Sequence, residues 1–210
     1  MRITKFVHSC LLVEDQGKAV LIDPGNYSWE SGLVNLDKLP QLDYMLITHE
    51  HADHFHLPFV KAVMAKQPQI NILTTQPVAE VLKPAGIKAA TKSQGPVDIW
   101  QVAHEALPWQ MPVPLNIGLT VFEQLTNPGD SFQLTKTRRI LALPIVAPWG
   151  AFKQAFDLIM KLKPEVVIPI HDAALTDDAR ENFFYARSHD FFKSQHINFV
   201  PIVSGQPVEI

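Results

Sequence analysis

Apolar residues in the first quarter of the chain occur in short runs separated by polar turns, a pattern typical of strands. The turn Asp15-Gln16-Gly17 predicts a hairpin between two such runs. Strands are predicted at residues 3–7, 11–14, 19–22, 44–47, 70–74, 87–90, 97–103, 116–125, 139–144, 165–170 and 199–203. Helical spacing predicts helices at 57–66, 77–83, 151–162 and 178–193, and residues 26–43 are expected to form a loop. The alternation of strands and helices predicts sheets covered by helices.

Length and composition place limits on the class of protein. The 210 residues are expected to form one domain, residues 1–210, because a chain of this size can bury a two-layer core. A net charge of −3 offers no basic face, so no nucleic-acid partner is expected. The local basic group Lys136, Arg138 and Arg139 is interpreted as an exposed hairpin rather than a binding surface.

The single cysteine, Cys10, excludes an internal disulfide and is interpreted as a small buried apolar residue. No apolar run approaches the length of a membrane span, and the N-terminus lacks the apolar core of a signal peptide. We therefore expect a cytoplasmic protein with no membrane partner. The sequence leaves the oligomeric state open.

A cluster of metal-binding residue types directly follows the apolar run at 44–47. Its members are His49, His51, Asp53 and His54. On an extended backbone the first three alternate onto one side and the last points elsewhere. This arrangement suits two metal ions better than one, because a single tetrahedral site would leave a ligand over. Imidazole and carboxylate donors fit zinc, manganese or iron.

Two further histidines directly follow predicted strands. His104 comes after the strand at 97–103, and His171 after the strand at 165–170. From this position a side chain can reach a site at the edge of a sheet. Asp130 lies in a Pro-Gly-Asp sequence that, by itself, is an ordinary turn.

The H-x-H-x-D-H spacing at 49–54 resembles the signature of the metallo-β-lactamase fold superfamily, and the other landmarks resemble its UlaG-like branch of metal-dependent hydrolases. The resemblance implies an α/β fold, an αββα four-layer sandwich of two mixed sheets flanked by helices. It also implies a dinuclear site, with zinc the expected metal and manganese or iron as alternatives. The implied ligands are His49, His51 and His104 for one ion and Asp53, His54 and His171 for the other, with Asp130 bridging both.

Three more residues are candidates for supporting roles. Asp23 ends a strand expected beside 44–47, where it either orients a histidine ligand or opens the following Pro-Gly turn. His8 either faces the mouth of the site or is a structural histidine in a turn. Trp149 either lines the pocket or packs in the core. Many family members carry histidine at the position of Asn127, a difference that bears on substrate handling more than on metal binding.

The expected activity is hydrolysis. Two ions can share a water, lower its pKa and hold the resulting hydroxide as the nucleophile. Asp53 and Asp130 are the predicted catalytic residues, and Asp53 is also expected to relay a proton to the leaving group. The expected substrate is a small-molecule ester, lactone or phosphoester. Two alternatives are a catalytically silent metal-binding protein of the same fold and a di-iron redox protein.

Overall fold

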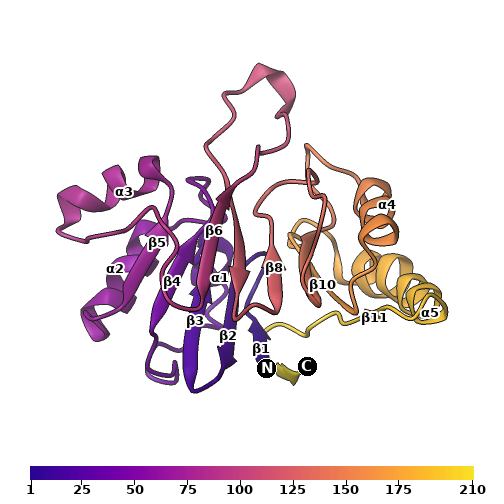
Figure 1. Ribbon diagram of the computed structural model, residues 1–210, viewed down its shortest axis with the longest axis horizontal. Coiled ribbons are helices and arrows are strands. Elements are labelled where there is room, and N and C mark those ends of the chain that lie inside the picture. The colour runs from indigo at the N-terminus through magenta and orange to yellow at the C-terminus, as the bar shows by residue number, and fades with distance from the viewer.

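The computed structural model describes residues 1–210, which form two mixed six-stranded sheets (Figure 1). The first sheet contains, in spatial order, β12 (Pro207–Glu209), β1 (Arg2–Lys5), β2 (Leu11–Asp15), β3 (Lys18–Ile22), β4 (Tyr44–Ile47) and β5 (Asn71–Thr74). The second contains β11 (Asn198–Phe199), β10 (Val166–Ile170), β9 (Ile140–Pro144), β8 (Leu125–Asn127), β7 (Ile117–Val121) and β6 (Val97–Gln101).

Helices form the two outer layers. They are α1 (Asn26–Glu30), α2 (Leu57–Lys66), α3 (Gln76–Leu82), α4 (Phe152–Leu162) and α5 (Ala186–Ser194), with a π-helix at Ala179–Tyr185 and 3-10 turns at Lys83–Ala85 and Pro108–Gln110. Helices α2 and α3 lie over the first sheet, and α4 and α5 lie over the second (Figure 1). None of these helices combines the length and apolar character needed to cross a bilayer.

Where helices cover the sheets, the strands bury both of their faces, which explains the continuous apolar runs in the sequence. In β4, Tyr44 and Leu46 join the core between the sheets, whereas Met45 and Ile47 join the core beneath α2. In β9, Ile140 and Ala142 face the first sheet, while Leu141 and Leu143 face the helices. The predicted αββα sandwich of two mixed sheets flanked by helices is confirmed.

Several predicted elements differ from the structure. Residues 116–125 form two strands, because Phe122 and Glu123 adopt positive φ angles of 53° and 57° and turn the chain. Phe122 is buried, so this turn carries an apolar residue and lacks the usual polar signal. Residues 87–90 form no strand, and only Ala90 makes a bridge to β5. The predicted loop at 26–43 begins with α1, and the short edge strand β12 was not predicted.

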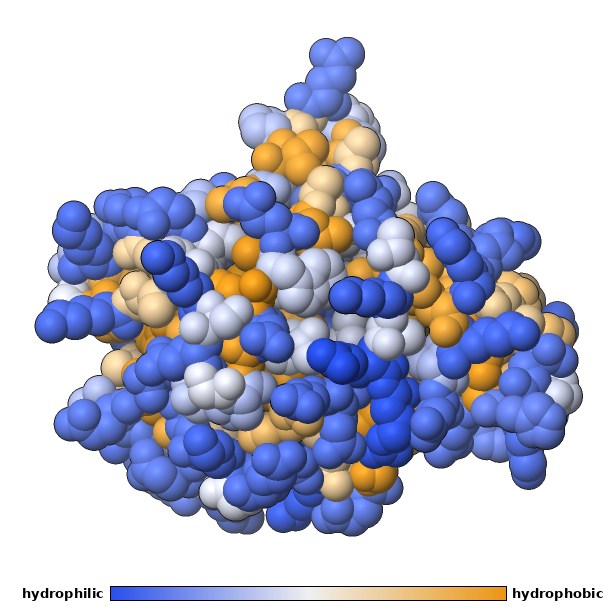
Figure 2. All heavy atoms as spheres, in the orientation of Figure 1, coloured by the Kyte–Doolittle hydropathy of each residue, from blue (hydrophilic) through white to orange (hydrophobic).

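The segment between β6 and β7 projects from the body of the molecule (Figure 1). Apolar side chains are visible on this projection (Figure 2). Among its residues, Trp109 is 80% exposed and Met111 is 51% exposed. Both side chains are therefore largely open to solvent.

The sheet topology brings the candidate site residues to one edge. Strands β3 and β4 are parallel, so Asp23 and residues 48–54 leave the first sheet at the same edge. Strands β8, β9 and β10 are also parallel, which places Asp130 and His171 at one edge of the second sheet. The Ile117 N–H donates to the Thr48 carbonyl at 3.1 Å and joins the two edges.

Candidate metal centre

Eight histidine and aspartate side chains converge at this edge in two clusters, within each of which the donor atoms lie within 4.8 Å of one another. The first cluster is His49, His51, His104 and Asp130, and the second is His8, Asp53, His54 and His171. All seven predicted metal ligands are therefore brought together, and His8 joins them.

One detail of the sequence reasoning is wrong. The extended-loop argument placed Asp53 beside His49 and His51, but Asp53 lies with His54 and His171 in the second cluster, the grouping that the family resemblance implied. The N–H groups of His54 and Phe55 both donate to the His51 carbonyl, at 3.0 and 2.8 Å. The loop therefore coils after His51, and the alternation of an extended backbone ends there.

Asp130 lies between the two clusters and is 1% exposed. Its Oδ2 atom is 3.7 Å from His49 Nε2 and 3.5 Å from His104 Nε2 in the first cluster. Toward the second cluster, Oδ2 is 3.3 Å from His171 Nε2 and Oδ1 is 3.1 Å from His54 Nε2. This is the position that a carboxylate contacting two ions requires.

Four of the converging atoms are buried without a hydrogen-bond partner. They are the Nε2 atoms of His54, His104 and His171, and Oδ1 of Asp130. Their close approaches lack hydrogen-bond geometry, and an unsatisfied buried polar group costs about 1–3 kcal/mol. Four such atoms at one point are the donor set that a cation would satisfy.

In the first cluster, neutral groups fix the outer nitrogens of the imidazole rings. The His49 Nδ1–H donates to Thr48 Oγ1 at 3.0 Å, and the His104 Nδ1–H donates to the Glu105 carbonyl at 2.7 Å. Both rings therefore present an unprotonated Nε2 to the cluster. His51 turns its Nδ1 inward instead, 3.1 Å from His49 Nε2.

Asp23 positions His54 of the second cluster through hydrogen bonds. Its Oδ2 accepts from His54 Nδ1–H at 2.8 Å and from Thr48 Oγ1–H at 2.9 Å, while Oδ1 accepts from the Thr48 N–H at 2.8 Å. Asp23 is fully buried and also forms the turn, because its carbonyl accepts from the Gly25 N–H at 2.8 Å. Both roles weighed for Asp23 from the sequence are thus present in its geometry.

Gly25 allows this turn to touch the ligand loop. A Cβ atom at Gly25 would lie 1.8 Å from the carbonyl oxygen of Asp53. The Asn26 N–H donates to the Ala52 carbonyl at 2.8 Å beside this contact. The turn after β3 therefore fixes the backbone of the ligand loop.

His8 orients Asp53. The Ala173 N–H donates to His8 Nδ1 at 3.3 Å, so the proton of a neutral ring sits on Nε2, which donates to Asp53 Oδ2 at 3.1 Å. Burial, opposed by the Asp53 carboxylate, lowers the pKa of His8 to about 4 and keeps the ring neutral. This tautomer positions a carboxylate and leaves His8 no inward lone pair.

His171 rests on a buried ionic network that the sequence reasoning missed. The Lys5 ammonium donates to Asp172 Oδ2 at 2.6 Å, and the Tyr185 hydroxyl donates to the same oxygen at 2.5 Å. His171 itself has a positive φ of 62°, and its Nδ1–H donates to the Val146 carbonyl at 2.8 Å. A lysine at the end of β1, directly before the apolar residues Phe6 and Val7, is the one sequence signal for this network.

The carboxylates of the site remain ionised. Burial alone would raise the pKa of Asp130, but His54 and His171 hold it well below its usual range. Burial likewise would raise the pKa of Asp53, which the neighbouring His171 and the hydrogen bond from His8 lower. Burial would lower the pKa of His171, but Asp130 and Asp53 raise it to about 9. The two aspartates therefore attract positive charge into the site.

Aromatic rings form the walls around the clusters. The ring of Trp149 lies with its centroid 5.7 Å from His104 and 5.4 Å from His171, so this half-buried side chain spans both clusters. The Tyr27 ring is 5.0 Å from that of His8. For Trp149 the geometry matches the pocket-wall alternative.

Asn127 holds the turn that carries Asp130. Its Oδ1 accepts from the Gly129 N–H at 2.8 Å, and the side chain is fully buried. Gly129 has a φ of +59°, and a Cβ there would come within 2.1 Å of Asn116 Oδ1. Asn127 therefore acts on the position of a candidate ligand rather than on the mouth of the site.

Comparison with known proteins gives the family. Residues 18–148 match the family described as the beta-lactamase superfamily domain. The chain belongs to the metallo-β-lactamase superfamily. Protein Rv0786c of Mycobacterium tuberculosis is 28% identical over 198 residues, covering 89% of this chain and 91% of that protein. A metal-dependent hydrolase of Nanoarchaeum equitans is 24% identical over 200 residues, covering 81% and 83%.

Solved structures show the same superfamily fold. A novel metallo hydrolase from Ignicoccus hospitalis matches with a TM-score of 0.70 at 18% identity, covering 99% of this chain and 97% of that one. CmlA, a diiron β-hydroxylase from Streptomyces venezuelae, matches with a TM-score of 0.71 at 12% identity. That match covers all of this chain but 54% of CmlA.

Proposed function

We propose that this chain is a metal-dependent hydrolase that uses two divalent ions to cleave an ester, lactone or phosphoester bond in a small molecule. The family match and the similarity to a metal-dependent hydrolase of Nanoarchaeum equitans support a metal-dependent hydrolase of the metallo-β-lactamase fold. The observation that carries the proposal is the set of buried, unpartnered donor atoms that converge around Asp130.

The residues fit two ions. His49, His51 and His104 would hold one, and Asp53, His54 and His171 would hold the other, with Asp130 contacting both. We propose zinc, because three imidazoles with a carboxylate are a common zinc environment, and manganese or iron accept the same donors. When bound, the ions would supply activation of a water molecule and polarisation of the substrate oxygen.

The two predicted catalytic aspartates differ in access to solvent. The Asp53 side chain is 26% exposed, whereas that of Asp130 is 1% exposed. Asp53 can therefore exchange a proton with a leaving group at the mouth of the site, and the hydrogen bond from His8 fixes its carboxylate. Asp130 holds its charge between the clusters and stays out of proton exchange.

Cys10 does not offer a competing covalent mechanism. It is 1% exposed, and burial raises the pKa of its thiol far above the ordinary value despite a hydrogen bond with Ser28. A reactive cysteine needs a thiolate and access to substrate. Hydrolysis by this chain therefore rests on the clusters.

The test is metal content and hydrolysis in wild type and His51→Ala. We expect about two ions per chain by elemental analysis, and at least a ~100-fold loss of hydrolysis with reduced metal content in the variant, since removal of a ligand exceeds the 10–100-fold effect of supporting residues. The control is His189→Ala, because His189 is an exposed histidine on α5. Wild-type activity in His51→Ala, or no bound metal after reconstitution, would overturn the proposal.

A di-iron redox role is the second candidate function, because the chain shares its fold with the diiron β-hydroxylase CmlA. The same experiment separates the two functions. Two irons per chain with a visible absorption band, and no hydrolysis of lactones, esters or phosphodiesters, would favour the redox role. Bound metal without any turnover would favour a catalytically silent protein.

A further inference from the structure

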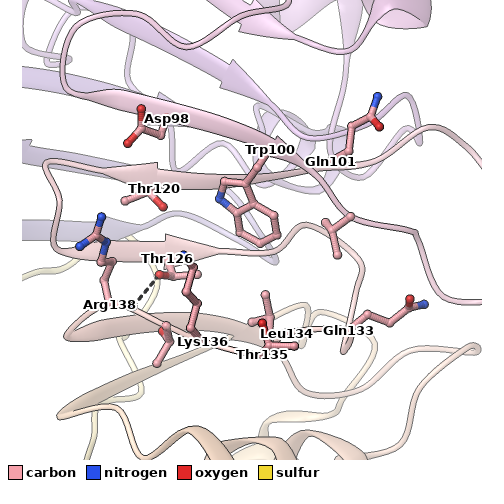
Figure 3. Close-up of a pocket in the computed structure, with 12 residues that line it drawn as sticks. Asp98, Trp100, Gln101, Thr120, Thr126, Gln133, Leu134, Thr135, Lys136 and Arg138 are labelled. Carbon is pink, nitrogen blue, oxygen red and sulfur yellow. Dashed lines mark hydrogen bonds between the residues drawn. The ribbon is translucent and has the colours of Figure 1, made fainter.

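We propose that the outer face of the second sheet carries a separate ligand site for an aromatic anion of mononucleotide size. The site, called here the Trp100 cavity, is a hollow of about 550 Å³ (Figure 3). Its principal lining residues are Asp98, Trp100, Thr120, Thr126, Lys136 and Arg138. None of these belongs to the histidine and aspartate clusters, so the proposal is independent of the hydrolase assignment.

The floor of the Trp100 cavity is the part of the sheet that the helices leave open. Helices α4 and α5 lie over β9, β10 and β11, whereas β6, β7 and β8 carry no helix on this side (Figure 1). Asp98 pairs with Thr120 across β6 and β7, and Thr120 pairs with Thr126 across β7 and β8. Outward side chains of these strands therefore form one polar row.

Trp100 supplies a flat aromatic surface beside this row. It pairs with Gly118 on β7, and a Cβ at Gly118 would lie 2.2–2.5 Å from the six-membered ring of the indole. The ring thus rests on the backbone of Gly118, and it remains half-buried where it borders the cavity (Figure 3). A fixed, half-exposed indole is a surface on which a planar ligand can stack.

The wall opposite the floor is residues 133–138. The Arg138 N–H donates to Thr126 Oγ1 at 2.9 Å, which attaches this segment to β8 (Figure 3). Lys136 and Arg138 are exposed, and neither takes part in any ion pair of the lysine and arginine side chains. Thr137, which also lines the cavity, has a buried hydroxyl without a hydrogen-bond partner.

These features define the chemistry of the ligand. Two unpaired cations attract an anionic group such as a phosphate or carboxylate, and the indole accepts a planar ring. Asp98 accepts hydrogen bonds from ligand hydroxyls, as a ribose would offer. The volume lies in the usual range of small-molecule sites and accommodates a nucleoside monophosphate.

The structure also revises the interpretation of the basic group in the sequence. Arg139 turns away from the cavity and donates to Gln124 Oε1 at 3.1 Å. Lys136 and Arg138 alone face the open floor, and they do so beside an aromatic ring. The segment is therefore a wall of the Trp100 cavity, not a plain exposed hairpin.

The test is isothermal titration calorimetry of the full chain with adenosine monophosphate, adenosine and inorganic phosphate. We expect the monophosphate to bind at least 10-fold more tightly than either part. The double variant Lys136→Ala/Arg138→Ala should weaken that binding at least 10-fold, and thermal melting should match wild type because both side chains are exposed. Lys88→Ala/Lys92→Ala makes the same change of charge at exposed positions elsewhere and should bind like wild type.

The source of the ligand is distinguished by a further titration with benzoate, a ring-bearing carboxylate without a ribose. Equal binding of benzoate would assign an aromatic carboxylate rather than a nucleotide, within the same chemical class. No binding of either compound at millimolar concentration would overturn the proposal. Unchanged binding in Lys136→Ala/Arg138→Ala would place the ligand outside the Trp100 cavity, and loss of binding in His51→Ala would place it at the clusters. Either result would also overturn the proposal.

Discussion

The two clusters of candidate ligands are supported in different ways. In the first, Thr48 and the backbone of Glu105 hold the outer nitrogens of the rings, so support comes from neutral groups next to the ligands in sequence. In the second, support comes from segments distant in sequence: Asp23 at His54, the Val146 carbonyl at His171, and the Lys5–Asp172–Tyr185 network next to His171.

The first cluster is thus positioned by residues near its ligands in sequence, and the second by residues far from its ligands in sequence. Thr48 and the Glu105 carbonyl are adjacent in sequence to His49 and His104, so they keep their place beside these ligands. The first cluster therefore depends mainly on the loop at 48–54 and on the start of the segment after β6. Both clusters combine residues from the two sheets, but the Lys5–Asp172 contact beside the second cluster joins residues 167 positions apart. We therefore expect substitutions outside the ligands to act mainly on the second cluster.

The largest effect is expected for Lys5→Met, which tests whether the Lys5–Asp172 ion pair is stabilising. The Lys5 and Asp172 side chains are 4% and 2% exposed, and removing the cation leaves an uncompensated buried carboxylate. Loss of one partner of a buried pair costs about 3–5 kcal/mol. Urea unfolding should show this loss, and Lys5→Met/Asp172→Asn should recover part of it. An unchanged midpoint in Lys5→Met would show that the network does not stabilise the second cluster.

Asp130→Asn tests whether the clusters act as one centre. The amide keeps the size of the side chain but removes the charge that lies 3.1–3.7 Å from histidines of both clusters. We expect less than two ions per chain, with one ion lost more readily, and at least a ~100-fold fall in hydrolysis, as for the removal of a ligand. Two fully retained ions would show that Asp130 does not bridge.

Asp23→Ala sharpens the difference between the clusters. Removal of a carboxylate that orients a metal-binding histidine lowers metal affinity by about 10–100-fold. We expect this effect on the ion of the second cluster, and a smaller one on the ion of the first, measured by competition with a chelator. Asp190→Ala serves as the control because Asp190 is exposed on α5. Equal weakening of both ions would remove the distinction.

The sequence by itself determined the layers of the fold and most of the candidate site. The apolar run at 44–47 predicted a strand buried on both faces, and β4 has these bounds because that signal is local. His104 and His171 were candidates because each follows a strand, and strand ends gather at a sheet edge. Asp130 lies in an ordinary turn, and only the resemblance to the superfamily pointed to it. Their role as metal ligands stays a prediction.

Only the tertiary structure decided how these side chains are shared and held. The coil after His51 assigned Asp53 to the second cluster, a choice set by two backbone hydrogen bonds that residue types do not encode. The tautomer of His8 depends on the N–H of Ala173, 165 positions away. The Trp100 cavity exists because Gly118 leaves room for the indole ring on a neighbouring strand. The last two features are contacts between segments distant in sequence, and a local pattern of residues carries no record of its partner.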